Sequence, residues 1–186
     1  MRGHLPSVTE ILASVGLSSD LPISPERRDY YLARGRALHA AIHYEAEGAL
    51  DDSTVHPDIA GGLSAYRKFV AETGHVPHLS ELELEHPAWR FMGHPDRLGY
   101  VNDKFALIDF KTNSVDLRCA RLQLGGYDLL LQANPDKVPV KIEQHLILQL
   151  RLDGTYALHP VIPDTQTFLA AVLVYQAKQQ RKPEAV

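Results

Sequence analysis

The stretch Gly93–Lys111, which reads GHPDRLGYVNDKFALIDFK, carries the strongest local pattern in the chain. It predicts two β-strands joined by a two-residue turn at Asn102-Asp103. Asn and Asp tolerate positive φ better than other non-glycine residues, so they suit a hairpin turn. In such a hairpin Asp96 and Asp109 lie equally far from the turn. The two carboxylates are therefore predicted to face each other across the strands, with Cβ atoms about 5 Å apart.

Alternation along the second predicted strand assigns its two faces. Lys111 shares a face with Asp109, and the opposite face consists of Ala106, Ile108 and Phe110, which suits a core. Two adjacent carboxylates repel each other, and a divalent cation such as Mg²⁺ removes that penalty. A lysine beside the metal could orient a water nucleophile and stabilise developing negative charge. A salt-bridge cluster on a solvated sheet face explains the same pattern, and these residues alone leave both interpretations open.

The composition is that of an ordinary globular protein and excludes several classes of site. A chain of 186 residues is predicted to be one domain, spanning 1–186, and is long enough to bury a core. No apolar run approaches the roughly 20 residues of a membrane span, and the N-terminus lacks a signal-peptide core. The single cysteine, Cys119, excludes an intramolecular disulfide and a four-cysteine zinc or iron–sulfur site. We therefore expect a cytoplasmic protein with no membrane partner.

The charge of the chain does not by itself indicate a nucleic-acid-binding protein. The formal net charge is −4, although acids that bind a divalent metal would overstate the negative field. Each local basic cluster fits either a phosphate-binding track or a solvated helix face. These clusters comprise Arg27, Arg28, Arg34 and Arg36, then Arg118 and Arg121, then Lys178, Arg181 and Lys182.

A long helix is predicted from Ser24, its N-cap, to about Glu47. Within it Gly35, His39 and His43 recur every four residues and share one stripe. A glycine inside a helix costs about 1 kcal/mol relative to alanine, so Gly35 suggests a close approach of another segment. His39 fits either a metal ligand aimed at the sheet or a partly buried packing histidine. Spacing is the whole support for His43, which is not assigned to the site.

A second helix is predicted from about Leu117 to Gln132, after the polar loop that follows Lys111. Gln123 and Tyr127 lie one turn apart on one face of it. They could reach the lysine or a phosphate, and a polar–aromatic surface pair is the alternative. Gly125-Gly126 inside this helix predicts close packing or backbone access.

The remaining elements follow from capping, periodicity and turn signals. Ser7 and Glu10 form a predicted capping box for a short helix, and His78 to His86 alternates strictly, which predicts one strand. Glu83 on its polar face could stand near the metal if this strand pairs beside Asp96. Further elements are a helix over about 57–73, strands over 141–152 and 156–162 joined at Asp153-Gly154, and a final helix from about 163.

The predicted order is helix–helix–helix–strand–hairpin–helix–hairpin–helix, an α/β sandwich with a mixed central β-sheet flanked by helices. Several motifs in this order resemble the PD-(D/E)XK nuclease superfamily, and its RecB-like branch of phage and bacterial exonuclease-like proteins. The resemblance runs from about Leu5 to Leu131 and implies a restriction-endonuclease-like αβββαβ core. Its motifs are LPSVTEIL from Leu5, RGRALH from Arg34 to His39, GHPD ending at Asp96, IDFK from Ile108 to Lys111 and QLGGY from Gln123 to Tyr127.

The resemblance assigns roles to particular residues. It implies a Mg²⁺ or Mn²⁺ ion, with Lys111 positioning the attacking water and supporting the transition state. Position 109 is Asp where many members have Glu, a substitution that the family pattern allows. The branch that carries iron–sulfur clusters is excluded by the cysteine count. The implied metal ligands are His39, Asp96, Asp109 and the backbone carbonyl of Phe110, and the implied auxiliary residues are Gln123 and Tyr127.

The implied function is that of a metal-dependent DNA nuclease, with an exonuclease of DNA recombination, repair or phage DNA processing favoured, in a bacterial or phage-infected cell. DNA is the implied partner, and a homo-oligomer or a helicase or recombination partner is compatible with the sequence. Two alternatives stay open: a catalytically inactive DNA-binding or assembly module with the nuclease fold, and a phosphoesterase of small nucleotides.

Overall fold

The computed structural model describes residues 4–18, 23–80, 82–112 and 114–180. Its helices are α1 (Val8–Ser14), α2 (Pro25–Ala46), α3 (Pro57–Thr73), α4 (Leu117–Gln132) and α5 (Thr165–Gln180), with a 3₁₀ turn at Asp52–Thr54. Its strands are β1 (Val76–Ser80), β2 (Leu84–His86), β3 (Phe91–Gly93), β4 (Arg97–Val101), β5 (Lys104–Lys111), β6 (Gln144–Leu150) and β7 (Tyr156–Pro160).

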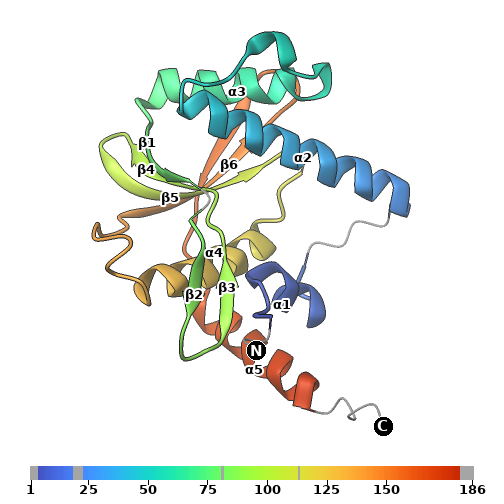
Figure 1. The fold of residues 1–186 in the computed structure, drawn as a ribbon, viewed down its shortest axis with the longest axis vertical. Coiled ribbons are helices and arrows are strands. Elements are labelled where there is room, and N and C mark those ends of the chain that lie inside the picture. Colours follow the sequence, from blue (N-terminus) through green and yellow to red (C-terminus); the bar gives the residue numbers. More distant parts are fainter. Residues whose placement is uncertain (1–3, 19–22, 81, 113, 181–186) are drawn as a thin grey trace.

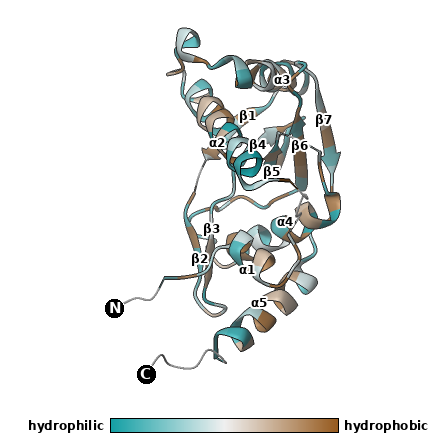
Figure 2. Cartoon of the chain, turned by 90° about the vertical axis from the view of Figure 1, so that its right-hand side faces the viewer, coloured by the Kyte–Doolittle hydropathy of each residue, from teal (hydrophilic) through white to brown (hydrophobic). Residues whose placement is uncertain are grey.

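Five strands form a mixed sheet in the order β1-β4-β5-β6-β7, and β2 and β3 form a separate pair. Helices α2 and α3 lie on one side of the sheet, and α1, α4 and α5 lie on the other (Figures 1 and 2). The α/β class, the mixed sheet and the αβββαβ order, from α3 through β1, β4, β5 and α4 to β6, are confirmed. Among the described residues, no helix combines the length and apolar character needed to cross a membrane.

The central hairpin has the predicted turn and register. Asn102 and Asp103 adopt positive φ angles of 49° and 63°, as a two-residue hairpin turn requires. β4 and β5 pair symmetrically about this turn, and the last pair is Arg97 with Ile108. Asp96 therefore lies one residue outside β4, where the ladder with β5 has ended. The cross-strand pair predicted for Asp96 becomes a contact with the end of β5, on the edge where β4 no longer pairs.

Strand β5 is buried on both faces, which bears on the interpretation of its polar face as solvated. Ala106, Ile108 and Phe110 belong to the core under α2 and α3, as predicted. The other face is not solvated, because Phe105 and Leu107 lie in the second core, with residues of α1, α4 and α5. The carboxylate of Asp109 on this face is only 1% exposed. The solvated location of the salt-bridge alternative is therefore wrong for Asp109, although the ion pair with Lys111 is present.

The strand predicted from His78 to His86 is wrong as one element. Its first part is the end of β1, which pairs with β4, and its last part is β2, which pairs with β3. Alternation reports which side chains share a face, but it does not report the partner strand, and the chain leaves the five-stranded sheet between the two parts. Glu83 lies in this connection, outside the strands, and its exposed carboxylate is 3.4 Å from Nε2 of His94.

The two helical glycine sites differ in their surroundings. A Cβ at Gly125 would lie 2.6 Å from the backbone oxygen of Asp164, and one at Gly126 would lie 2.8 Å from a methyl group of Val8, so the predicted close packing is confirmed. The close approach predicted at Gly35 is wrong for the described residues. Among them, a Cβ there would meet only Oγ1 of Thr112, at an ordinary contact distance of 3.8 Å.

This contrast predicts opposite effects of one substitution at two mid-helix positions. Gly125→Ala is expected to lower the free energy of unfolding by about 1–3 kcal/mol, because the new methyl group meets backbone that cannot move aside. Gly35→Ala is expected to leave stability unchanged or raise it by up to about 1 kcal/mol through helix propensity. Urea denaturation followed by circular dichroism measures both. Equal effects of the two substitutions would contradict the packing described here.

Candidate active site

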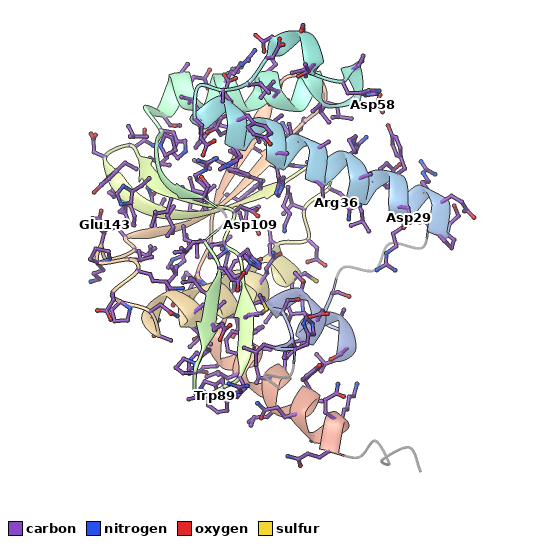
Figure 3. The ribbon with its side chains drawn as sticks, in the orientation of Figure 1. Asp29, Arg36, Asp58, Trp89, Asp109 and Glu143 are labelled. Atoms are coloured by element: carbon purple, nitrogen blue, oxygen red, sulfur yellow. The ribbon has the colours of Figure 1, made fainter. Side chains whose placement is uncertain are left out.

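The candidate site lies at the carboxyl end of β5. Strand β5 is followed by α4 and then by β6, which runs parallel to it with Lys111 opposite Gln149. The carboxyl end of a parallel strand is where open α/β sheets bind ligands. Beyond Ile108, no residue of β4 pairs with β5. Helix α2 covers one face of this end of β5, and α4 covers the other face. Figure 3 labels Asp109 at this central position, beneath α2.

Asp96 occupies the place that β4 leaves open. Its Oδ2 accepts a hydrogen bond of 2.8 Å from the backbone N–H of Phe110, and its Oδ1 lies 3.5 Å from Nδ1 of His39 on α2. Burial disfavours the charged carboxylate, but the nearby positive charges of His39 and Lys111 outweigh burial and hold the pKa of Asp96 below its ordinary value. Asp96 is therefore an anion held in a fixed orientation.

Asp109 is the most deeply buried acid of the site. Its Oδ2 lies 2.8 Å from Nζ of Lys111, and its Oδ1, which is out of contact with solvent, has no hydrogen-bond partner among the described residues. Burial raises the pKa of the Asp109 carboxyl to about 6, because the Lys111 ammonium offsets only part of the loss of solvation. An under-solvated carboxylate oxygen of this kind favours the binding of a cation.

Lys111 is held between the carboxylate and helix α4. Its Nζ donates a hydrogen bond of 2.8 Å to Oε1 of Gln123, and Nε2 of Gln123 donates one of 3.0 Å to the hydroxyl of Tyr127. Burial alone would lower the pKa of Lys111, but the charges of Asp109 and Asp96 raise it, so the ammonium stays charged. The structure thus joins Gln123 and Tyr127 to the lysine, and their auxiliary role stays a prediction.

His39 reaches the site from α2. Its ring packs edge-on against Phe110, with ring centroids 5.6 Å apart, while Nδ1 faces Asp96. Burial opposes its protonation, but the Asp96 carboxylate raises the pKa of His39 above its ordinary value. His43, one turn later, points elsewhere and lies 3.4 Å from Glu47. Of the two histidines on this stripe, the structure brings only His39 to the acids.

The donor set suits a hard divalent cation. Asp96 and Asp109 supply carboxylate oxygens, which Mg²⁺ prefers. In a β-strand, the N–H and C=O of one residue point to the same edge of the strand. The N–H of Phe110 bonds Asp96, so the Phe110 carbonyl points to that edge as well. The unsatisfied Oδ1 of Asp109 is a further observation in favour of the fit.

The ammonium of Lys111 lies against one of the two carboxylates of the donor set. No three His, Cys, Asp or Glu side chains within the described parts of the chain surround one point closely enough to hold a metal. Nζ of Lys111 is equally close to Asp109 and to Gln123, at 2.8 Å from each. Asp109 and Gln123 therefore share the ammonium.

Arg97 is a charged residue beside the site that the sequence pattern did not single out. It is 2% exposed and lies on the face of β4 that packs under α2 and α3, opposite Ile108. Its charge affects the titration of both Tyr66 and His75. The sequence did hold a signal for its burial, since Arg97 falls in phase with the core-facing residues of the hairpin. Alternation alone, however, does not indicate a chemical role for a buried arginine.

Comparisons with known proteins give a limited result. No protein-family model and no curated protein matches the chain. Similar solved structures include the alkaline exonuclease LHK-Exo of Laribacter hongkongensis, with 15% identity over 93% of this chain and 88% of that one and a TM-score of 0.40. LHK-Exo in complex with dAMP matches with 16% identity over 94% and 89% of the two chains and a TM-score of 0.40.

A third similar structure, SSO0001, shows 15% identity over 96% of this chain and 87% of that one, with a TM-score of 0.38. At TM-scores near 0.4 the assignment of the site and of its function rests on the geometry described above.

The geometry predicts a metal-dependent increase in stability. Mn²⁺ is expected to raise the melting temperature of the protein, because a ligand at about 100 times its Kd stabilises the folded state by about 2.7 kcal/mol. Asp109→Asn is expected to abolish this increase. Asp128→Asn, which removes a part-buried carboxylate paired with His145, is the matched control and should retain it. Calorimetry at constant ionic strength measures the shift, and an undiminished shift in Asp109→Asn would place the metal elsewhere.

Proposed function

We propose that the chain is a metal-dependent DNA nuclease that hydrolyses phosphodiester bonds. The observation that carries the proposal is the buried carboxylate of Asp109, which has an unsatisfied oxygen, lies beside Asp96 and contacts a lysine that α4 holds in place. A metal held by two acids, with a positioned lysine beside it, can supply the activated water and the charge stabilisation for hydrolysis of a phosphodiester. The proposal extends to Mg²⁺ or Mn²⁺ as the cofactor.

Each residue has a defined task in this proposal. Asp96, Asp109, the Phe110 carbonyl and His39 would hold the cation, which supplies charge stabilisation and an activated water when bound. The remaining steps belong to the protein. The Lys111 ammonium orients the attacking water and stabilises negative charge that develops on the phosphoryl oxygens. Gln123 accepts a hydrogen bond from that ammonium and keeps it at the site, and Tyr127 orients Gln123.

An exonuclease is the favoured type, and this choice rests on the resemblance of the motifs to the RecB-like branch. A role in DNA recombination, repair or phage DNA processing belongs to the same proposal. The inactive binding module is disfavoured, since His39, Asp96, Asp109 and Lys111 are all present and adjacent. A phosphoesterase of small nucleotides would use the same groups, so the substrate must be tested directly.

Lys111 provides the most specific test of the proposal. Lys111→Ala is expected to lower the rate of DNA cleavage by about 100-fold or more, because it removes a preorganised positive charge from the transition state. The assay uses linear and circular DNA, single- and double-stranded, in Mg²⁺, Mn²⁺ and EDTA. Lys104→Ala removes a lysine at the other end of β5 and should cleave at the wild-type rate.

The outcomes separate the candidates. Cleavage that needs metal and spares circular DNA supports an exonuclease. Wild-type cleavage by Lys111→Ala at matched metal occupancy, measured by the stability shift, would refute the role of the lysine. Absence of cleavage by the wild-type protein in either metal, with DNA still bound, would favour the non-catalytic module. Hydrolysis of mononucleotide esters without cleavage of DNA would favour the small-nucleotide phosphoesterase.

A further inference from the structure

The amino-terminal half of α2 projects away from the rest of the molecule. In Figure 1 it extends to the right of the sheet, past the end of α3. Its first buried side chain is Leu38, so residues 25–37, here called the α2 arm, form more than three turns of helix without a core. Tyr30 and Leu32 on this arm are 47% and 49% exposed. An exposed helix without a hydrophobic face needs another reason for its composition.

Two of the four arginines on the arm brace it against its own aromatic residues. Nε of Arg27 donates a hydrogen bond of 3.0 Å to the hydroxyl of Tyr31, and the guanidinium of Arg34 lies 5.1 Å from the Tyr31 ring centroid. Tyr30 in turn donates a hydrogen bond of 2.7 Å to Asp58 in the first turn of α3. These contacts occupy one side of the arm and fix its direction.

The other two arginines, Arg28 and Arg36, do not brace the arm in this way. Arg28 and Arg36 are exposed, and the side chain of neither forms an ion pair or hydrogen bond with any residue in the described part of the chain. Arg28 precedes His39 by about three full turns and Arg36 precedes it by nearly one, so both lie on the side of α2 that His39 presents to the site. Figure 3 shows Arg36 on α2 between Asp29 at the outer end and the central Asp109.

The same stripe faces the active site along its inner length. His39 contacts Asp96, and the position of a Cβ on Gly35 is 3.8 Å from Thr112, the residue directly after Lys111. The arginines continue this line outward, and at a rise of about 1.5 Å per residue Arg28 and Arg36 are about 12 Å apart along the helix. They form a short track that starts at the metal site.

The charge of the arm is opposite to that of the whole chain. Residues 25–37 contain four arginines against Glu26 and Asp29, a net charge of +2, whereas the chain carries −4. The arm is therefore a local positive surface on an acidic protein. Its unpaired charges favour a polyanion whose negative groups repeat along a line.

We propose that Arg28 and Arg36 bind the phosphates of one polynucleotide strand as it extends from the metal site along the α2 arm. The inference rests on the proposed nuclease function and specifies its substrate, because a mononucleotide would reach neither the whole track nor its outer arginine. Arg27 and Arg34 keep the arm in position, and Leu32 offers an exposed apolar surface between the two phosphate contacts. The arm thus favours a polymer over a small nucleotide.

The test measures binding without cleavage. A fluorescein-labelled oligothymidylate of about 20 nucleotides is titrated with protein in EDTA, and fluorescence anisotropy gives the Kd at several salt concentrations. The double variant Arg28→Gln, Arg36→Gln keeps helix propensity, and Lys68→Gln, Lys104→Gln removes the same charge from α3 and from the far end of β5. Losing two phosphate contacts is expected to reduce the slope of log Kd against log salt by about 1.4. This corresponds to about 20-fold weaker binding near 0.1 M salt.

The outcomes do not depend on catalysis. Weaker binding and a smaller salt slope in the arginine variant, with the lysine variant close to the wild type, support the track. Equal losses in both variants, or none in the arginine variant, overturn it, as does a wild-type protein that fails to bind the oligonucleotide. Wild-type binding through the track in a protein that never cleaves DNA would refute the nuclease while leaving the track intact. Circular dichroism of each variant confirms that α2 is still folded.

Discussion

The structure depends on a carboxylate that the fold removes from water. Asp109 sits on the central strand of the sheet, where one core covers it from the α4 side and the other covers its neighbours from the α2 side. An isolated charge in such a place is costly, and the chain compensates with an ammonium two residues away on the same strand. That compensation is incomplete, since the pKa of Asp109 stays raised and one oxygen stays unsatisfied. A buried acid that is stabilised only in part is the kind of group that structures retain for binding or catalysis.

The remaining parts of the site follow from how the sheet ends. The two-residue turn sets the register of the hairpin, and the pairing of β4 with β5 ends at Arg97. Asp96, the residue before Arg97, can therefore turn its carboxylate onto the N–H of Phe110. The crossover through α4 then returns Gln123 to the lysine of the strand that preceded it. Short-range geometry within the hairpin and one long-range packing of α4 are enough to assemble acids, lysine and amide. Helix α2 contributes a histidine from its packed half and, in our proposal, a phosphate track from its exposed half.

The sequence predicted the parts of the fold that depend on local geometry. Asn102-Asp103 predicted the turn, alternation predicted the core face of Ala106, Ile108 and Phe110, and the capping box at Ser7 predicted the start of α1. The spacing of Asp96 and Asp109 indicated that the acids would meet. The motif order supplied the αβββαβ arrangement and the grouping of the lysine with Gln123 and Tyr127, which the structure brings together.

Features that depend on distant segments could not be predicted in this way. The alternation over His78 to His86 continues through a break between two sheets. A period of two shows which side chains share a face, but it does not show which strand is the pairing partner. Gly35 looked like a site of close approach, but the space beside it depends on where Thr112 lies. The burial of Asp109 on both sides required the packing of α4, and the division of the arm's arginines into bracing and free pairs required the positions of Tyr31 and Asp58.

The central claim is that the acids at the end of β5 bind a divalent cation. A crystal structure of the protein grown with Mn²⁺, with anomalous data collected at the manganese edge, tests it most directly. The account predicts one dominant anomalous peak between the carboxylates of Asp96 and Asp109, next to the Phe110 carbonyl. No peak there at saturating Mn²⁺, or a dominant peak at Glu83 and His94 instead, would contradict it.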